Sequence, residues 1–152
     1  MQTGSTHAGQ SNEVARNAWG VIVHHPQWTT LELRWLPTTR DMSDDGFKET
    51  LQLLASEGER LRPASMFVDS NEFFHQPGMG VMDWRDEHII PRYNAAGVTR
   101  FAFLVPADTP NTVESGAVPQ VEGPATFSTG WFTTREKAYA WLTGSEGATG
   151  YA

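Results

Sequence analysis

Short apolar runs alternate along the chain with segments of helical periodicity, and this alternation restricts the fold more than any other feature. The apolar runs, rich in β-branched and aromatic residues, lie at residues 19–25, 28–36, 66–69, 101–105 and 126–132. Segments with helical spacing of apolar residues lie at 43–63, 81–96 and 136–142. Strand–helix–strand order favours a largely parallel sheet with helices packed on it. A short turn joins the first two runs, which are predicted to pair as an antiparallel hairpin.

The expected helices carry local start and stop signals. Ser43 is a favourable N-cap, and acidic residues follow it in the first turn, where they complement the helix dipole. Pro63 ends this helix. Pro91 lies inside the second helical segment and predicts a kink or a break into two short helices. Gly97 stands where a left-handed C-cap is expected, and Thr133 with Glu136 predicts a capping box for the last helix.

The ends of the chain lack periodicity. Residues 1–16 are predicted to form a flexible arm, residues 17–143 one α/β domain, and the Gly-rich residues 144–152 a flexible tail. Residues 106–124 contain four prolines and little apolar content, so a long flexible loop is expected there.

Composition excludes several classes of function. The 152-residue chain has a formal net charge of −7, which gives no basic footprint for nucleic-acid binding. It has no cysteine, so disulfides, thiolate nucleophiles and cysteine-based metal sites are excluded. No signal-peptide pattern and no apolar run of about 18 residues occurs, so we expect a cytoplasmic protein that does not insert into membranes.

An ordered series of segments resembles the SpoIIAA-like branch of the STAS superfamily, also described as STAS/SEC14 domain proteins. The segments are Trp35-Leu36-Pro37, Asp41-Met42-Ser43, Phe67-Val68-Asp69, Trp84 with Ile90-Pro91, Ala96-Gly97-Val98, Phe101-Ala102-Phe103 and Glu136-Lys137-Ala138 with Trp141-Leu142. The resemblance implies a mixed, mostly parallel sheet of four to five strands with about three helices, mostly on one side, and an N-terminal antiparallel hairpin.

The resemblance also implies a role as an interaction module. Anti-sigma-factor antagonists of the wider superfamily carry a serine that a partner kinase phosphorylates at the start of the helix after the Asp-ending strand. The matching region here, residues 74–78, keeps a glycine but has no hydroxyl side chain. This departure argues against a kinase-controlled switch at that position.

The loop at residues 69–80 is the predicted ligand site. It follows a predicted parallel strand and leads into a helix N-terminus, a place where open α/β sheets bind ligands. The candidate ligand-binding residues are Asp69, Asn71, Phe74, His75, Gly78 and Trp84. Trp84 belongs to this set because it falls off the apolar stripe of its helix. A structural alternative stays open, in which Asp69 caps the loop through backbone hydrogen bonds and Phe73 or Phe74 closes the core.

Catalytic and metal signals are weak. Residues 84–88 are the densest polar run, but they lack a second histidine at ligand spacing, so a solvated helix face with local ion pairs is predicted. His24 and His25 are neighbours on a predicted strand and point to opposite faces. We therefore predict no catalytic residues, no metal and no cofactor.

The leading hypothesis is a non-enzymatic STAS-like module that binds a protein partner or a small anionic or apolar ligand. The first alternative is a SEC14-like carrier of lipids or other apolar molecules, which needs an apolar cavity of about 300 Å³ or more. The second is a hydrolase that pairs His75 or His88 with Asp69 or Asp86, which needs hydrogen-bond distances between those groups. Homodimerisation through an exposed face or edge strand is also open.

Overall fold

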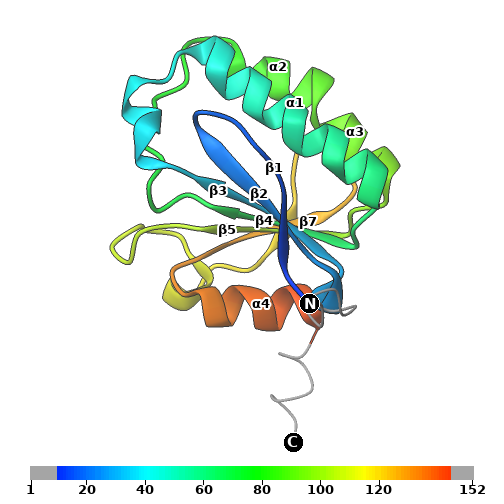
Figure 1. Ribbon diagram of the computed structural model, residues 1–152. Coiled ribbons are helices and arrows are strands. Elements are labelled where there is room, and N and C mark those ends of the chain that lie inside the picture. The colour runs from blue at the N-terminus through cyan, green and yellow to red at the C-terminus, as the bar shows by residue number, and fades with distance from the viewer. Residues whose placement is uncertain (1–9, 145–152) are drawn as a thin grey trace, which may run out of the picture.

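The computed structural model describes residues 10–144 as one β-sheet with helices on both faces (Figure 1). The strands are β1 (Asn12–Arg16), β2 (Gly20–His25), β3 (Thr30–Trp35), β4 (Ser65–Asp69), β5 (Arg100–Leu104), β6 (Gln120–Val121) and β7 (Ser128–Phe132). The α-helices are α1 (Asp44–Leu61), α2 (Val81–His88), α3 (Ile90–Ala96) and α4 (Arg135–Thr143). Short 3₁₀ helices are η2 (Pro26–Trp28), η3 (Pro37–Asp41) and η4 (Val113–Ser115).

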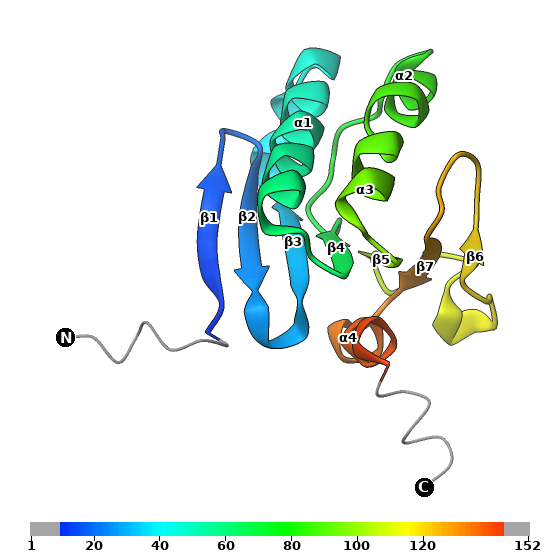
Figure 2. The same cartoon turned by 90° about the vertical axis from the view of Figure 1, so that its right-hand side faces the viewer.

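Strand order in the sheet is β1-β2-β3-β4-β5-β7-β6, and Figure 2 shows the strands side by side in this order. β3, β4, β5 and β7 are parallel to one another, whereas β1, β2 and β6 pair antiparallel with their neighbours. The predicted α/β class and the hairpin of β2 and β3 are therefore confirmed. The predicted number of strands, four to five, and the predicted mostly parallel pairing are wrong. The described sheet has seven strands, and its outer strands on both sides pair antiparallel.

The two additional edge strands come from segments that were expected to be flexible. β1 lies in the predicted arm of residues 1–16, of which residues 1–9 lie outside the described part, as do residues 145–152 of the tail. β6 lies in the predicted loop of residues 106–124. Neither segment has a strong strand pattern, so pairing with β2 and with β7 stabilises it.

Edge strand β1 carries features that oppose pairing with another chain. Its register shifts between Glu13 and Ala15, and Glu13 forms an ion pair with Arg16 at 2.7 Å. Bulges and charged side chains on an edge disfavour strand addition. Homodimerisation remains a prediction, and this edge does not favour it.

Local signals place most helix ends correctly. The Ser43 hydroxyl accepts a hydrogen bond from the Gly46 N–H at the start of α1. The second helical segment breaks at Ile89 into α2 and α3, with Pro91 in the first turn of α3. Gly97 has a φ of 94° at the end of α3, as a left-handed cap requires. Within residues 10–144 no helix combines the length and the apolar composition that crossing a bilayer requires.

The capping box predicted for the last helix is wrong. The N-cap of α4 is Thr134, whose hydroxyl accepts from the Lys137 N–H. The free N–H groups of Thr133 and Thr134 instead donate to the Glu114 carboxylate at 2.9 and 3.2 Å. Glu114 belongs to η4, so the long loop supplies the acidic cap from 19 and 20 residues away in sequence. Sequence neighbours of the helix could not reveal this partner.

Alternation along the parallel strands separates two cores. Met66 and Val68 of β4 belong to the cluster that packs beneath α1 and α3, whereas Phe67 belongs to the cluster beneath α4. Figure 1 shows α1, α2 and α3 on one face of the sheet and α4 on the other. Successive strand residues point to opposite faces, so each parallel strand is buried on both sides.

Gly58 allows α1 to approach the sheet closely. A Cβ atom at this position would lie 2.6 Å from the terminal methyl of Met66. We expect Gly58→Leu to lower the free energy of unfolding by about 1–3 kcal/mol, because it overpacks this contact. Gln52→Leu, at an exposed position of the same helix, is the matched control and should change stability by less than about 0.5 kcal/mol. Urea unfolding measures both variants. Equal stabilities of Gly58→Leu and Gln52→Leu would contradict the close approach of α1 to the sheet at Gly58.

Candidate functional site

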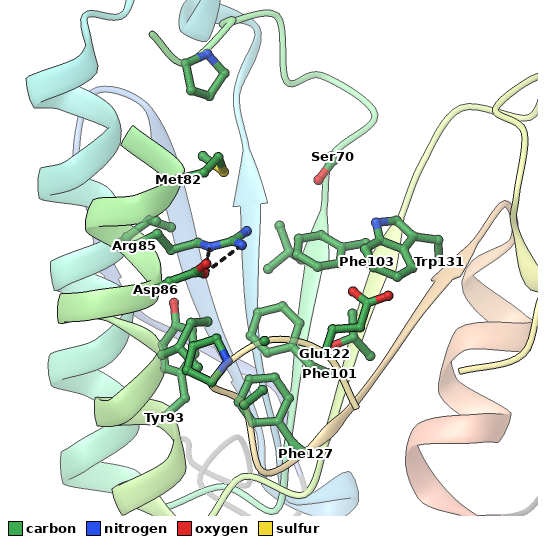
Figure 3. Close-up of a pocket in the computed structure, with 18 of the residues that line it drawn as sticks. Ser70, Met82, Arg85, Asp86, Tyr93, Phe101, Phe103, Glu122, Phe127 and Trp131 are labelled. Carbon is green, nitrogen blue, oxygen red and sulfur yellow. Dashed lines mark hydrogen bonds and ion pairs between the residues drawn. The ribbon is translucent and has the colours of Figure 1, made fainter. Parts of the chain in front are cut away.

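A pocket of about 400 Å³ lies between the sheet and the layer of α1, α2 and α3. Strands β3, β4, β5 and β7 contribute its floor, and the segment at residues 122–127 closes the side opposite the helices (Figure 3). Its aromatic lining consists of Trp35, Phe47, Phe73, Tyr93, Phe101, Phe103, Phe127 and Trp131. This volume lies within the range of pockets that bind small molecules.

Two stacked ring pairs give the pocket flat apolar surfaces. The rings of Phe103 and Trp131 lie 5.6 Å apart with an interplanar angle of 11°. Those of Phe101 and Phe127 lie 5.5 Å apart at 25°. Neighbouring parallel strands present Phe103 and Trp131 in register, which explains their stacking. Such surfaces favour a planar ring that can stack or pack edge-to-face.

Charged groups border the pocket without giving it a positive character. Arg85 of α2 donates to the Asp86 carboxylate at 3.0 Å, and both residues line the pocket. Glu122 lies exposed on the opposite side. The local ion pairing predicted for residues 84–88 is present. Arg85 and Asp86 are half-exposed, and both also line the pocket.

Tyr93 of α3 places a buried hydroxyl at the pocket. The residue is only 2% exposed, and its ring contacts Phe101 with centroids 5.5 Å apart. Figure 3 shows the hydroxyl directed toward Arg85 and Asp86. No residue of the described range 10–144 forms a hydrogen bond with it. Burial raises the pKa of Tyr93 more than the nearby arginine charges lower it, so the hydroxyl stays protonated at neutral pH.

Asp69, the first of the predicted site residues, faces away from this pocket. Its Oδ2 accepts from Arg135 of α4 at 2.7 Å, and its Oδ1 accepts from the Asn71 N–H at 3.1 Å. Asp69 therefore caps the loop, as the structural alternative predicted. Asn71 is exposed. Phe74 is 46% exposed beneath the Arg40 guanidinium, and Phe73 is the side chain that packs on the core, with its ring 4.9 Å from that of Trp35.

His75 and Gly78 meet at the carboxylate of Asp44, one of the acidic residues in the first turn of α1. His75 Nε2 lies 2.8 Å from Asp44 Oδ1, and the Gly78 N–H donates to the same oxygen at 3.1 Å. The Gly78 hydrogen bond, together with that of His75, lowers the pKa of Asp44. Trp84 packs toward α1, where the Lys48 ammonium lies 5.3 Å from its ring.

The pocket thus borders the predicted loop but not through the predicted side chains. Ser70, Phe73 and Pro77 of this loop line it, and none of the six predicted residues does. A ligand-binding role for those six remains a prediction. The important residues that were missed are Arg85 and Tyr93. Tyr93 was visible in the sequence as a member of the apolar face of its helix, but its free hydroxyl was not.

Asp44 is expected to hold the loop of residues 70–80 against α1. Replacing it by asparagine removes the charge that His75 and the Gly78 N–H share, so amide hydrogen exchange around these two residues should accelerate about fivefold to tenfold. Asp45→Asn, at an exposed neighbour in the same helical turn, is the matched control. Unchanged exchange in Asp44→Asn, or an equal increase in the control, would contradict this anchoring role.

A second polar cluster lies on the α4 face of the sheet. Its centre is Glu32, whose side chain is 0% exposed. Both carboxylate oxygens accept from Arg135, at 3.1 and 3.2 Å, and Oε1 also lies 2.7 Å from His25 Nε2. Burial raises the pKa of Glu32, but hydrogen bonds from His25 and Arg135 and the charges of Arg135 and Arg34 outweigh it and lower this pKa to about 2.

His25 extends this cluster to the start of β1. Because Glu32 is ionised, Nε2–H of His25 donates to it, and Nδ1 lies 2.5 Å from the Ser11 hydroxyl oxygen. Hydroxyl, imidazole and carboxylate follow here in the order used by serine hydrolases. The carboxylate, however, also neutralises two guanidinium groups, and none of these residues lines the pocket described above. We interpret the cluster as a structural tie between β1, the sheet and α4.

The histidines and aspartates of the hydrolase hypothesis have other partners. His75 pairs with Asp44, and His88 lies 3.1 Å from Glu87. Asp69 pairs with Arg135 and Asp86 with Arg85. In the described residues no hydrogen bond joins either histidine to Asp69 or Asp86, and no three His, Asp or Glu side chains gather as metal ligands would.

Comparisons of the chain with protein-family models, with curated proteins and with solved structures find no match. The resemblance to the STAS superfamily therefore depends on the sequence segments alone.

Proposed function

We propose that this protein is a non-enzymatic module that binds a small, planar, largely apolar molecule between the sheet and helices α1, α2 and α3. One observation carries the proposal: a pocket of about 400 Å³ whose floor and sides are stacked aromatic rings. The volume exceeds the approximately 300 Å³ that an apolar-molecule carrier needs. The proposal therefore joins the ligand-binding hypothesis to the alternative of a SEC14-like carrier. Assignment to the STAS superfamily stays part of it.

A protein partner is the second candidate. Phe74, Met79 and Met82 are exposed apolar side chains on or just after the loop of residues 70–80. Exposed apolar side chains in proximity are a feature of interaction surfaces. Met82 also lines the pocket, so a partner that docks on this loop would reach the pocket mouth.

Titration calorimetry with an uncharged, planar probe tests the ligand proposal. We expect 2-acetylnaphthalene to bind the full chain saturably with a stoichiometry of one. The tryptophans that line the pocket supply a second readout, because a stacked ligand should change their fluorescence. Absence of saturable binding by both methods, with the protein folded by circular dichroism, would refute the proposed function.

A further inference from the structure

We propose that the pocket selects uncharged planar molecules that carry a carbonyl oxygen, which the Tyr93 hydroxyl and Arg85 bind. This inference depends on the proposed function and adds to it the chemistry of the ligand. Its basis is that the pocket is lined mainly by apolar rings but has a small group of hydrogen-bond donors at one side.

The Tyr93 hydroxyl is a donor held in position without a protein acceptor. It is buried, it is directed toward the pocket side of α2 (Figure 3), and within residues 10–144 nothing accepts its proton. A buried hydroxyl without a partner is unfavourable, so native proteins satisfy such groups with water or with a ligand. In a pocket of about 400 Å³ a water molecule can occupy the place that a ligand oxygen takes on binding.

Arg85 supplies a second donor beside Tyr93. Its Nε and Nη2 donate to Asp86 Oδ1, whereas no acceptor for Nη1 exists among the described residues. The positive charge of Arg85 acts on the Tyr93 hydroxyl and opposes, without overcoming, the rise in its pKa that burial causes. Figure 3 shows the guanidinium extending from α2 into the pocket. One oxygen atom with two lone pairs, such as a ketone or quinone oxygen, can accept from both groups.

The charge balance favours an uncharged ligand over a carboxylate or phosphate. Asp86 already neutralises Arg85, and Glu122 adds a negative charge on the opposite side of the pocket. An anion would therefore enter a site without net positive charge and lose its hydration among aromatic rings. A neutral carbonyl oxygen loses much less hydration free energy than an anion, and it accepts hydrogen bonds from the same donors, Tyr93 and Arg85.

The test compares three probes that share the naphthalene ring. They are 2-acetylnaphthalene with its carbonyl, 2-isopropenylnaphthalene with a methylene in place of the oxygen, and the anion 2-naphthoate. In the wild-type protein the ketone should bind about tenfold more tightly than either of the others. Tyr93→Phe should reduce the ketone's advantage over its isopropenyl analogue to about twofold. Tyr139→Phe removes a half-buried tyrosine hydroxyl on the α4 face, which does not line the pocket, and should leave the advantage unchanged.

The outcomes separate this inference from the proposed function. Equal saturable binding of the ketone and its isopropenyl analogue, or tighter binding of 2-naphthoate, would overturn the carbonyl inference and leave an apolar-ligand site. An advantage of the ketone that persists in Tyr93→Phe would also overturn it. Absence of binding by all three probes would refute the proposed function itself. Circular dichroism and urea unfolding confirm that each variant is folded before its affinities are compared.

Discussion

Replacement of Arg135 by methionine is expected to lower the free energy of unfolding at pH 7 by about 3 kcal/mol. Arg135 is the residue that joins the two carboxylates of the α4 face, Glu32 and Asp69. Its removal leaves Glu32 fully buried with less positive charge around it, and an incompletely paired buried charge is strongly destabilising. The value lies at the lower end of the usual range because His25 and Arg34 still face Glu32.

Arg92→Met is the matched control for this variant. Arg92 also forms a bidentate pair, with Glu59 at 2.7 and 2.8 Å, but that pair joins α1 and α3 at the surface. Its loss should cost less than about 1 kcal/mol. Arg135→Lys keeps the charge without the planar fork, so an intermediate loss is expected. If urea unfolding gives equal losses of stability for Arg135→Met and Arg92→Met, the Glu32 cluster does not make the large contribution to stability that we expect.

The destabilisation should depend on pH in a defined direction. The folded-state pKa of Glu32, about 2, lies below its ordinary value of 4.5, so its contribution is present above about pH 4.5 and is lost as the pH falls through about 2. Without Arg135 the pKa of Glu32 rises toward its ordinary value. The ionised Glu32 therefore stabilises the variant less, and the variant loses less stability when the pH falls. The stability difference between wild type and Arg135→Met should therefore narrow between about pH 4.5 and pH 2. A difference that stays constant across this range would show that lost packing of Arg135 on Phe67, rather than charge, causes the effect.

Ala125→Trp is expected to abolish binding of planar probes. Ala125 lies in the segment between β6 and β7 and lines the pocket opposite the helices. It is half-buried, so an indole at this position can enter the space that a ligand ring would occupy without displacing the core. Calorimetry with 2-acetylnaphthalene should then give no saturable heat, while urea unfolding shows stability equal to or above that of wild type.

Val118→Trp is the matched control for the blocked pocket. It introduces the same side chain into the same long connection, at an exposed position that does not line the pocket. Binding should be unchanged in this variant. If both tryptophan variants bind the probe as the wild type does, the ligand lies elsewhere and the proposed site is wrong.

Features that depend on local hydrogen bonds and backbone restrictions were predictable from sequence. The Ser43 cap, the break near Pro91 and the left-handed Gly97 all follow from chemistry within a few residues. β1 and β6 were not predictable in this way, because a neighbouring strand supplies their hydrogen bonds. The prediction of the α4 cap was wrong for the same reason, because Glu114 belongs to a loop that is distant in sequence.

The candidate site shows the same division. The loop after β4 was expected to carry a ligand site, because parallel strands present such loops at their carboxyl ends, and three residues of this loop line the pocket. Which side chains face the pocket was a different question. Residues 66–68 are apolar throughout, so the pattern could not reveal that Val68 and Ser70 face the pocket while Asp69 faces α4.

By itself, the sequence determined the alternation of strands and helices, the hairpin, most of the helix ends and the acidic, cysteine-free chemistry of this protein. Each of these depends on composition or on neighbours along the chain. Only the tertiary structure decided the full width of the sheet, the partner of Asp69 and the meeting of Arg85, Tyr93 and the stacked rings around one space. The reason is physical: a pocket is the volume that packing leaves unfilled between elements distant in sequence, and no local pattern encodes that volume.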